Sequence, residues 1–264
     1  MQSLLESLQT KRKYNELLTE YTMELKNRSD KSMLARFSEL RKFSMDIIEK
    51  SDIFYIREAT EMLLPKFLDT VDKLGVVSEI NNRPIFHNRW IIPIKTEDGL
   101  VENLVGYTNE ANERYIYGTA AYYRRRDTLY GLENIHKAYK LGYAILTEGI
   151  TDTIRLRDLG YENSFAICGT HKSEFIMNQL NRCKYGIIKL GDRDAPGLRA
   201  MKNWKVYKGI NLYVNLDYKD VDEMCSKNPA SIDILKTYIS DCVNWLTQYE
   251  HRGKVCEQLQ VTIL

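Results

Sequence analysis

Six carboxylates in the second half of the sequence stand just past apolar runs that suit buried strands. Glu148 and Asp152 follow residues 143–147, Asp192 and Asp194 follow residues 186–190, and Asp220 and Asp222 follow residues 211–216. In an open parallel sheet, ligands bind beyond the carboxyl ends of the strands, so these side chains are expected to converge. Clustered carboxylates cannot all stay ionised without a counter-charge. Mg²⁺ or Mn²⁺ would provide it, because these cations prefer oxygen ligands and bind phosphate groups. The pattern predicts a divalent metal site that acts on phosphates.

The spacing within the pairs supports this interpretation. Asp192 and Asp194 are two residues apart as the chain leaves a strand, so they project to one side while Arg193 points elsewhere. Asp152 falls in the first turn of the expected next helix, where the helix dipole favours an acid. Taken singly, each acid also suits a helix N-cap or a solvated loop end. Three pairs after three strands favour the metal site.

The elements that must position these acids alternate between strand and helix. Strands are predicted at residues 143–147, 164–168, 186–190 and 211–216, with helices at 151–159, 172–181 and 197–206 between them. This alternation is typical of a parallel sheet built from βαβ units. Gly142 and Gly160 suit helix C-caps, and residues 230–251 have the pattern of one long amphipathic helix.

The first 80 residues carry no chemical signature. Residues 1–50 contain no Pro or Gly and predict a helical hairpin with a break at residues 27–30. Further helices are predicted at residues 56–64 and 65–73. Packing of the hairpin on the main domain is favoured over its use as a DNA-binding arm.

From residue 83 the pattern changes to short strands. Residues 90–94 and 104–107 predict a β-hairpin, residues 114–117 predict a third strand, and residues 133–141 predict a helix. The densest basic cluster, residues 124–126, lies beside two tyrosines in this region. Aromatic rings next to arginines suit stacking on single-stranded template, and packing in the core is the alternative.

Composition excludes several classes of protein. Charged residues make up 28% and hydrophobic residues 44% of the chain, and no apolar run approaches the roughly 18 residues that a membrane span needs. We therefore expect no membrane partner and a cytoplasmic location. The five cysteines are scattered without a CxxC pair and the four histidines do not cluster with them, so no zinc is expected in this chain.

Three of these segments resemble the TOPRIM signature shared by primases, topoisomerases and some nucleases. They are Glu148-Gly-Ile-Thr-Asp152, Cys168-Gly-Thr170 and Asp192-Arg-Asp-Ala-Pro-Gly197. Together with Asp220–Glu223 they are most similar to the motifs of DnaG-type primases of bacteria and phages. The resemblance implies an α/β fold: a TOPRIM parallel sheet flanked by helices, preceded by a mixed α+β basic subdomain and N-terminal helices.

The resemblance extends upstream of the predicted sheet. Residues 88–94 resemble the D-R-x-x-F-P-I run of the primase catalytic core, residues 114–117 its K-Y-L-N run, and residues 125–132 its K-G-R-Q-L-Y-G-L run. The implied organisation is an N-terminal helical region at 1–80, a basic primase-like subdomain at 81–141, a TOPRIM domain at 142–226 and a helical tail at 227–264.

The resemblance implies RNA primer synthesis on a single-stranded DNA template from ribonucleoside triphosphates. Glu148, Asp192 and Asp194 would hold catalytic Mg²⁺ or Mn²⁺, and Asp152, Asp220 and Asp222 a second ion or its water. The implied nucleotide- and template-binding residues are Arg89, Arg114, Arg125, Arg124 and Arg126.

The sequence departs from the family in places. Tyr117 replaces an asparagine, Glu110 and Asp127 replace arginines, and Val221 replaces a proline. The family's zinc ribbon and helicase module have no counterpart here, so a helicase or a separate zinc-ribbon subunit is expected as a partner, as in a pared-down phage protein within the host cytoplasm. A TOPRIM nuclease and a non-catalytic accessory protein that binds single-stranded DNA are the alternatives.

Overall fold

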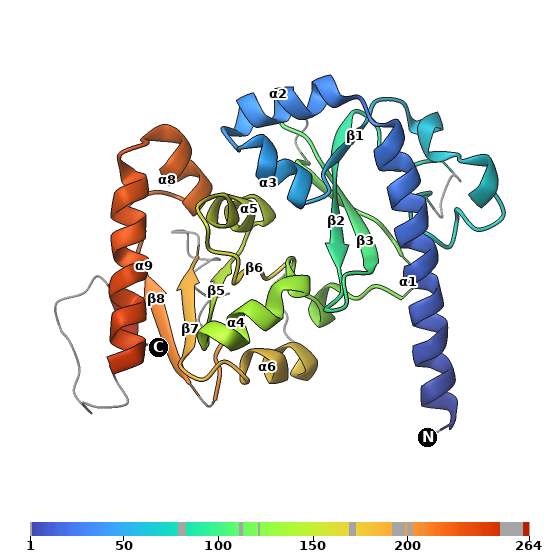
Figure 1. Ribbon diagram of the computed structural model, residues 1–264. Helices are drawn as coiled ribbons and strands as arrows, with labels where there is room; N and C mark the ends of the chain where they lie inside the picture. Colours follow the sequence, from blue (N-terminus) through green and yellow to red (C-terminus); the bar gives the residue numbers. More distant parts are fainter. Residues whose placement is uncertain are drawn as a thin grey trace. The chain divides into compact units, whose positions relative to one another are not determined.

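The computed structural model describes residues 2–78, 83–110, 113–120, 122–168, 173–191, 199, 203–207, 209–248 and 261–263. Its contacts divide the chain into two compact units, Met1–Arg124 and Arg125–Leu264 (Figure 1). Each unit is built on a sheet of its own. Within the described ranges, no helix is both long and apolar enough to cross a membrane.

Three helices begin the first unit: α1 (Gln2–Arg28), α2 (Lys31–Arg41) and α3 (Met45–Lys50). They confirm the helices predicted before residue 50 and the break near residue 29. Asp30 is the N-cap of α2, and its carboxylate accepts the Ser32 backbone N–H at 2.9 Å. Lys42 ends α2 in the left-handed region, with φ of 53°, so the second predicted helix is divided in two.

The sheet of the first unit is antiparallel, with strand order β1-β2-β3-β4. Its strands are β1 (Phe54–Ile56), β2 (Arg89–Lys95), β3 (Val101–Tyr107) and β4 (Tyr115–Tyr117). The last three confirm the predicted hairpin and third strand. The helix predicted at residues 56–64 is wrong, because aromatic and β-branched side chains place β1 beside β2 and only a 3-10 turn at Ala59–Met62 follows. The helix expected from Pro65 is likewise reduced to a 3-10 turn, Pro65–Phe67.

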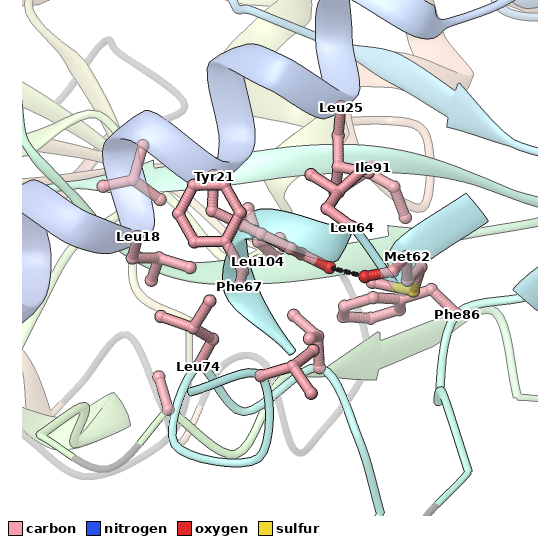
Figure 2. Packing of buried hydrophobic residues seen from close by; sticks show 14 of the residues in the cluster. Leu18, Tyr21, Leu25, Met62, Leu64, Phe67, Leu74, Phe86, Ile91 and Leu104 are labelled. Carbon is pink, nitrogen blue, oxygen red and sulfur yellow. Dashed lines mark hydrogen bonds between the residues drawn. The ribbon is translucent and has the colours of Figure 1, made fainter. Parts of the chain in front are cut away.

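One face of α1 forms the core of this unit with the sheet. Leu18, Tyr21 and Leu25, at helical spacing, are buried against Ile91 and Leu104 and the loops between β1 and β2 (Figure 2). The Tyr21 hydroxyl donates to the Met62 carbonyl oxygen at 2.7 Å. This bond satisfies the hydroxyl that Tyr21 carries into the core, and the Tyr14 hydroxyl of the same helix donates to the Lys73 carbonyl oxygen.

The second unit contains a five-stranded sheet with order β6-β5-β7-β8-β9. The parallel strands β5 (Tyr143–Thr147), β6 (Ser164–Ala166), β7 (Gly186–Leu190) and β8 (Ile210–Val214) confirm the four predicted from alternation. An antiparallel edge strand, β9 (Val261–Ile263), was not predicted. Gly186 has φ of 130°, and a Cβ there would lie 2.0 Å from the Ile210 carbonyl oxygen, so only glycine fits between β7 and β8.

Helices cover both faces of this sheet (Figure 1). Apolar residues of α4 (Ile135–Leu141) and α6 (Glu174–Leu180) join one buried cluster. Residues of α5 (Ile150–Asp158), α8 (Val221–Lys227) and α9 (Ser231–Gln248) join another. Gly142 caps α4 as predicted, with φ of 81°, whereas α8 was not predicted. The helix expected at residues 197–206 falls mostly outside the described residues, and residues 204–206 are not helical.

Candidate functional site

The carboxyl ends of three parallel strands line up at one edge of the second sheet. Thr147 pairs with Leu190 of β7 on one side and with Ala166 of β6 on the other. Glu148 therefore leaves β5 beside the residues that leave β7, and its side chain is half-buried. Asp192 and Asp194 follow β7 by two and four residues but lie outside the described residues. The predicted meeting of Glu148 with Asp192 and Asp194 stays a prediction.

The turn after β5 is fixed by a threonine and a glycine. The Thr147 hydroxyl lies 2.7 Å from that of Thr153 and 3.1 Å from the Gly149 carbonyl oxygen. A Cβ on Gly149 would lie 2.5 Å from Oδ2 of Asp152, closer than van der Waals contact allows. A side chain at residue 149 would displace the Asp152 carboxylate, so the glycine in the Glu148-Gly motif leaves room for it.

Asp152 and Asp222 form a buried acidic junction between α5 and α8. Each is 5% exposed, and the Asp222 backbone N–H donates to Oδ1 of Asp152 at 2.8 Å. The Asp222 carboxylate accepts from the Arg155 guanidinium at 3.0 and 3.2 Å. Asp158 lies 3.6 Å from the same guanidinium. The helices that carry Asp152 and Asp222 are thus joined by a network that includes the Arg155 guanidinium.

Asp220 caps the helix that carries Asp222. Its carboxylate accepts the Glu223 backbone N–H at 2.7 Å, and Glu223 in turn accepts the Lys219 backbone N–H at 2.9 Å. Glu223 thus reaches back to the residue before the cap, so the two bonds do not form a capping box, in which it would accept the N–H of Asp220 itself. The hydrogen bonds from Lys227 and from the Lys219 backbone lower the pKa of Glu223. Asp220 therefore satisfies one of the N–H groups that begin α8.

Among the described residues, no group of three or more His, Cys, Asp or Glu side chains could hold a metal ion. Two of the three predicted catalytic ligands, Asp192 and Asp194, lie outside that part of the chain. The donors that the sequence brings to this edge are carboxylate oxygens, which suit Mg²⁺ or Mn²⁺. The four cysteines whose burial is described, Cys168, Cys183, Cys225 and Cys242, are all buried free thiols.

The predicted basic residues differ in their surroundings. Arg89 is buried on β2, and its guanidinium donates to the carbonyl oxygens of Glu113 and Arg114 at 3.1 to 3.2 Å. Burial lowers the pKa of Arg89. Arg114 and Arg124 are exposed. Arg89 fixes the backbone that leads into β4, and its predicted contact with nucleotide stays a prediction.

In the second unit, Arg125 is exposed and lies beside the end of β6. Its Nε–H donates to the Cys168 carbonyl oxygen at 2.8 Å, which ties the basic segment to the Cys168-Gly-Thr170 motif. The motif's remaining residues and the side chain of Arg126 lie outside the described residues. Among the predicted basic residues in the described part of the chain, Arg125 therefore has a hydrogen bond to the segment that follows β6 at the carboxyl edge of the sheet.

Sequence reasoning missed the two arginines that brace this site. Arg155 pairs with Asp222, and Arg157 donates to the Gly131 and Ser164 carbonyl oxygens at 2.9 and 3.2 Å and to Glu133 at 2.9 Å. The only signal in the sequence is a basic residue one helical turn after Asp152. Its partner lies 67 residues away, which local spacing does not reveal.

Comparisons with known proteins find sequence similarity to DNA primases. No family model matches the sequence. The DNA primase of Thermotoga maritima is 26% identical over 231 residues, covering 82% of this chain and 40% of that protein. The DNA primase of Aquifex aeolicus is 29% identical over 167 residues, covering 62% of this chain and 33% of that protein. The chain thus spans less than half the length of either relative.

Solved structures share the fold at low sequence identity. A DnaG primase catalytic domain bound to single-stranded DNA superposes with a TM-score of 0.72 at 18% identity, covering 86% of this chain and 79% of that one. The fold is that of the DnaG primase catalytic core. The Escherichia coli primase catalytic core gives 0.66 at 20% identity, covering 83% and 77%. The DnaG-core fold confirms the predicted α/β class with a helix-flanked parallel sheet.

Proposed function

We propose that this chain is the catalytic core of a DNA primase, which joins ribonucleotides into short primers on single-stranded DNA. The observation that carries this proposal is the DnaG-core fold, found together with the acidic motifs that the sequence places at the carboxyl edge of its parallel sheet. The names of the relatives support the same reaction. We further propose that residues 142–226 form a TOPRIM domain.

In this proposal, Glu148, Asp192 and Asp194 hold Mg²⁺ or Mn²⁺. The register of Thr147 with Leu190 supports it, because β5 and β7, the strands that these acids follow in the sequence, end at the same level. Bound there, the metal would lower the pKa of the attacking primer hydroxyl and offset the charge of the triphosphate. The chain's own residues then have mainly to position the reactants.

The remaining acids have contacts that favour positioning over direct metal binding. Asp222 is held by Arg155, and Asp220 caps α8. Asp152 accepts the Asp222 backbone N–H, so it joins the turn that carries Glu148 to α8. We propose that these acids orient Glu148 and bind a second ion through water.

The basic residues bind phosphates in this proposal. Arg125 is exposed and anchored through Nε to the Cys168 carbonyl oxygen, so its guanidinium is held while it faces solvent. Arg114, Arg124 and Arg126 add cations near it in the sequence, and planar guanidinium groups suit phosphate oxygens. Arg89 supports them through the backbone of residues 113 and 114. A helicase or a separate zinc-ribbon subunit is the expected additional partner.

Primer synthesis on single-stranded DNA with Mg²⁺ or Mn²⁺ tests the proposal. Asp192→Ala and Glu148→Gln are expected to lose at least roughly 100-fold in rate, since losing even an outer partner of a metal ligand commonly costs 10- to 100-fold. Asp233→Asn, an exposed acid on α9, is the matched control and should synthesise primers normally.

The same assay separates the alternatives. Normal synthesis by Asp192→Ala would refute the metal assignment. Cleavage of DNA without nucleoside triphosphates would instead indicate a TOPRIM nuclease. Binding of single-stranded DNA with no synthesis under any metal condition would indicate an accessory protein.

A further inference from the structure

The edge of the second sheet opposite the acidic motifs is basic and aromatic. The first residues of β5, β7 and β8 pair in register, Tyr143 with Gly186 and Gly186 with Ile210. The segments that lead into these strands, residues 136–142, 181–186 and 203–209, contain six lysine or arginine residues and no aspartate or glutamate. Cations therefore lead into these three strands, whereas Glu162 precedes the fourth parallel strand, β6, and pairs with Lys137 at 2.5 Å.

Hydrogen bonds join these three segments into one surface. The Tyr185 backbone N–H donates to the Gly142 carbonyl oxygen at 2.7 Å, and the Tyr185 carbonyl oxygen accepts the Ile210 N–H at 2.9 Å. The Tyr207 backbone N–H donates to the Asn181 side-chain oxygen at 2.7 Å. We call this surface the basic edge; it comprises Tyr139, Lys140, Arg182, Lys184, Tyr185, Lys205 and Tyr207.

The cations of the basic edge are exposed and two of them lie over tyrosine rings. The Arg182 guanidinium carbon is 4.1 Å from the centre of the Tyr139 ring, and the Lys184 ammonium is 4.7 Å from that of Tyr185. Lys140 and Lys205 are exposed as well. Neighbouring strands are about 4.8 Å apart, so cations at adjacent strand starts can lie within roughly 8 Å, the screening length at physiological salt. Their potentials add, and the surface favours a polyanion.

Tyr207 distinguishes this surface from a merely solvated lysine face. Its side chain is 81% exposed, while its backbone is held by Asn181. An exposed ring on a fixed backbone costs little entropy when a flat partner stacks on it. Proteins that bind single strands combine such rings with cations that follow the phosphates. Duplex DNA hides its base faces and could not use the ring.

We propose that the basic edge is a second binding site for single-stranded DNA, separate from the carboxyl edge of the sheet. The choice of DNA rests on the proposed function, in which the template is a single strand; the cations bind its phosphates and Tyr207 stacks on a base. Such a contact would hold template away from the reacting residues, so it would affect template affinity and leave the chemical step unchanged.

Binding of a fluorescent oligothymidylate in EDTA, without nucleotides, tests the proposal. Arg182→Gln/Lys184→Gln is expected to weaken binding several-fold and to reduce the slope of log K against log salt by about 1.4, because each phosphate contact on a single strand contributes roughly 0.7. Tyr207→Ala is expected to weaken binding at least about five-fold, the low end for loss of one stacked base. The control Lys31→Gln/Lys236→Gln removes two exposed lysines elsewhere and should change little.

The outcomes separate this site from the primase reaction. On template, the basic-edge variants should raise KM with kcat unchanged, whereas Asp192→Ala should abolish synthesis and keep EDTA binding. Basic-edge variants that bind oligothymidylate as tightly as the control would overturn the proposal, as would a wild-type protein that binds none. If binding falls as expected but no primers form, this site stands and the proposed function fails. Thermal unfolding of each variant checks that the fold is intact.

Discussion

Replacing Asp222 by asparagine tests what the acids after the last parallel strand do. Asp222 and Arg155 form an ion pair between α8 and α5, and their side chains are 7% and 5% exposed. The substitution keeps the size of the side chain and one hydrogen-bond acceptor but leaves the Arg155 cation in the interior. If Asp222 is chiefly the partner of Arg155, the folded state without metal should become less stable.

The size of the effect follows from burial. Removing one partner of a buried ion pair costs about 3–5 kcal/mol, because the other charge stays desolvated. Here Asp158, 3.6 Å from the same guanidinium, offsets part of that cost, and asparagine keeps an acceptor. We expect a loss of about 2–3 kcal/mol in the free energy of unfolding, below that range because of these two offsets. With a urea m-value of about 2 kcal/mol/M, the midpoint should fall by roughly 1–1.5 M.

Urea unfolding in EDTA, followed by circular dichroism, measures this change. Asp233→Asn, on the exposed face of α9, is the control and should shift the midpoint very little. A direct metal ligand would behave in the opposite way, since neutralising one of several clustered acids relieves repulsion when metal is absent. An Asp222→Asn protein as stable as wild type in EDTA, or more stable, would therefore refute the structural role given to the ion pair.

Three further predictions concern the second unit. Gly186→Ala should prevent folding or lower the free energy of unfolding by more than about 4 kcal/mol, because the added Cβ would lie 2.0 Å from the β8 backbone. The control is Gly99→Ala, whose Cβ would have nothing within 4 Å and which should cost only about 1–2 kcal/mol for the positive φ. Thermal unfolding compares the two variants. Asp220→Ala should lower the free energy of unfolding by about 1 kcal/mol, because it removes the N-cap of α8, whereas Asp220→Asn keeps a capping oxygen and should change stability very little. If the asparagine variant has normal stability but is defective in primer synthesis, Asp220 binds metal. Burial raises the pKa of three thiols to about 12, 11 and 12, those of Cys183, Cys225 and Cys242. The burial of these neutral thiols stabilises the fold fully below the ordinary thiol pKa near 9, and this stabilisation is lost as the pH rises toward the raised pKa values. The urea midpoint should therefore fall above about pH 9. A midpoint that stays constant up to pH 11 would contradict this prediction.

Local patterns in the sequence predicted the parallel sheet well. Strand runs such as residues 143–147 and 186–190 are mainly apolar because both faces of the sheet are covered by helices, and that signal needs no knowledge of distant residues. Gly142 was predicted as a cap for a similar reason, since the left-handed conformation is a local requirement. Strand β1 was not predicted, because it exists only by pairing with β2, more than 30 residues later.

The sequence by itself determined which residue types follow which strands: Glu148 after β5, the Asp192–Asp194 segment after β7, and Asp220 and Asp222 after β8. Only the tertiary structure decided how the described acids are used. Asp220 became a helix cap and Asp222 the partner of Arg155, while Asp152 accepts a backbone N–H from α8. The physical reason is that a carboxylate taken out of water needs a donor or a cation. Which one is nearest depends on the packing of α5 against α8 and not on spacing along the chain.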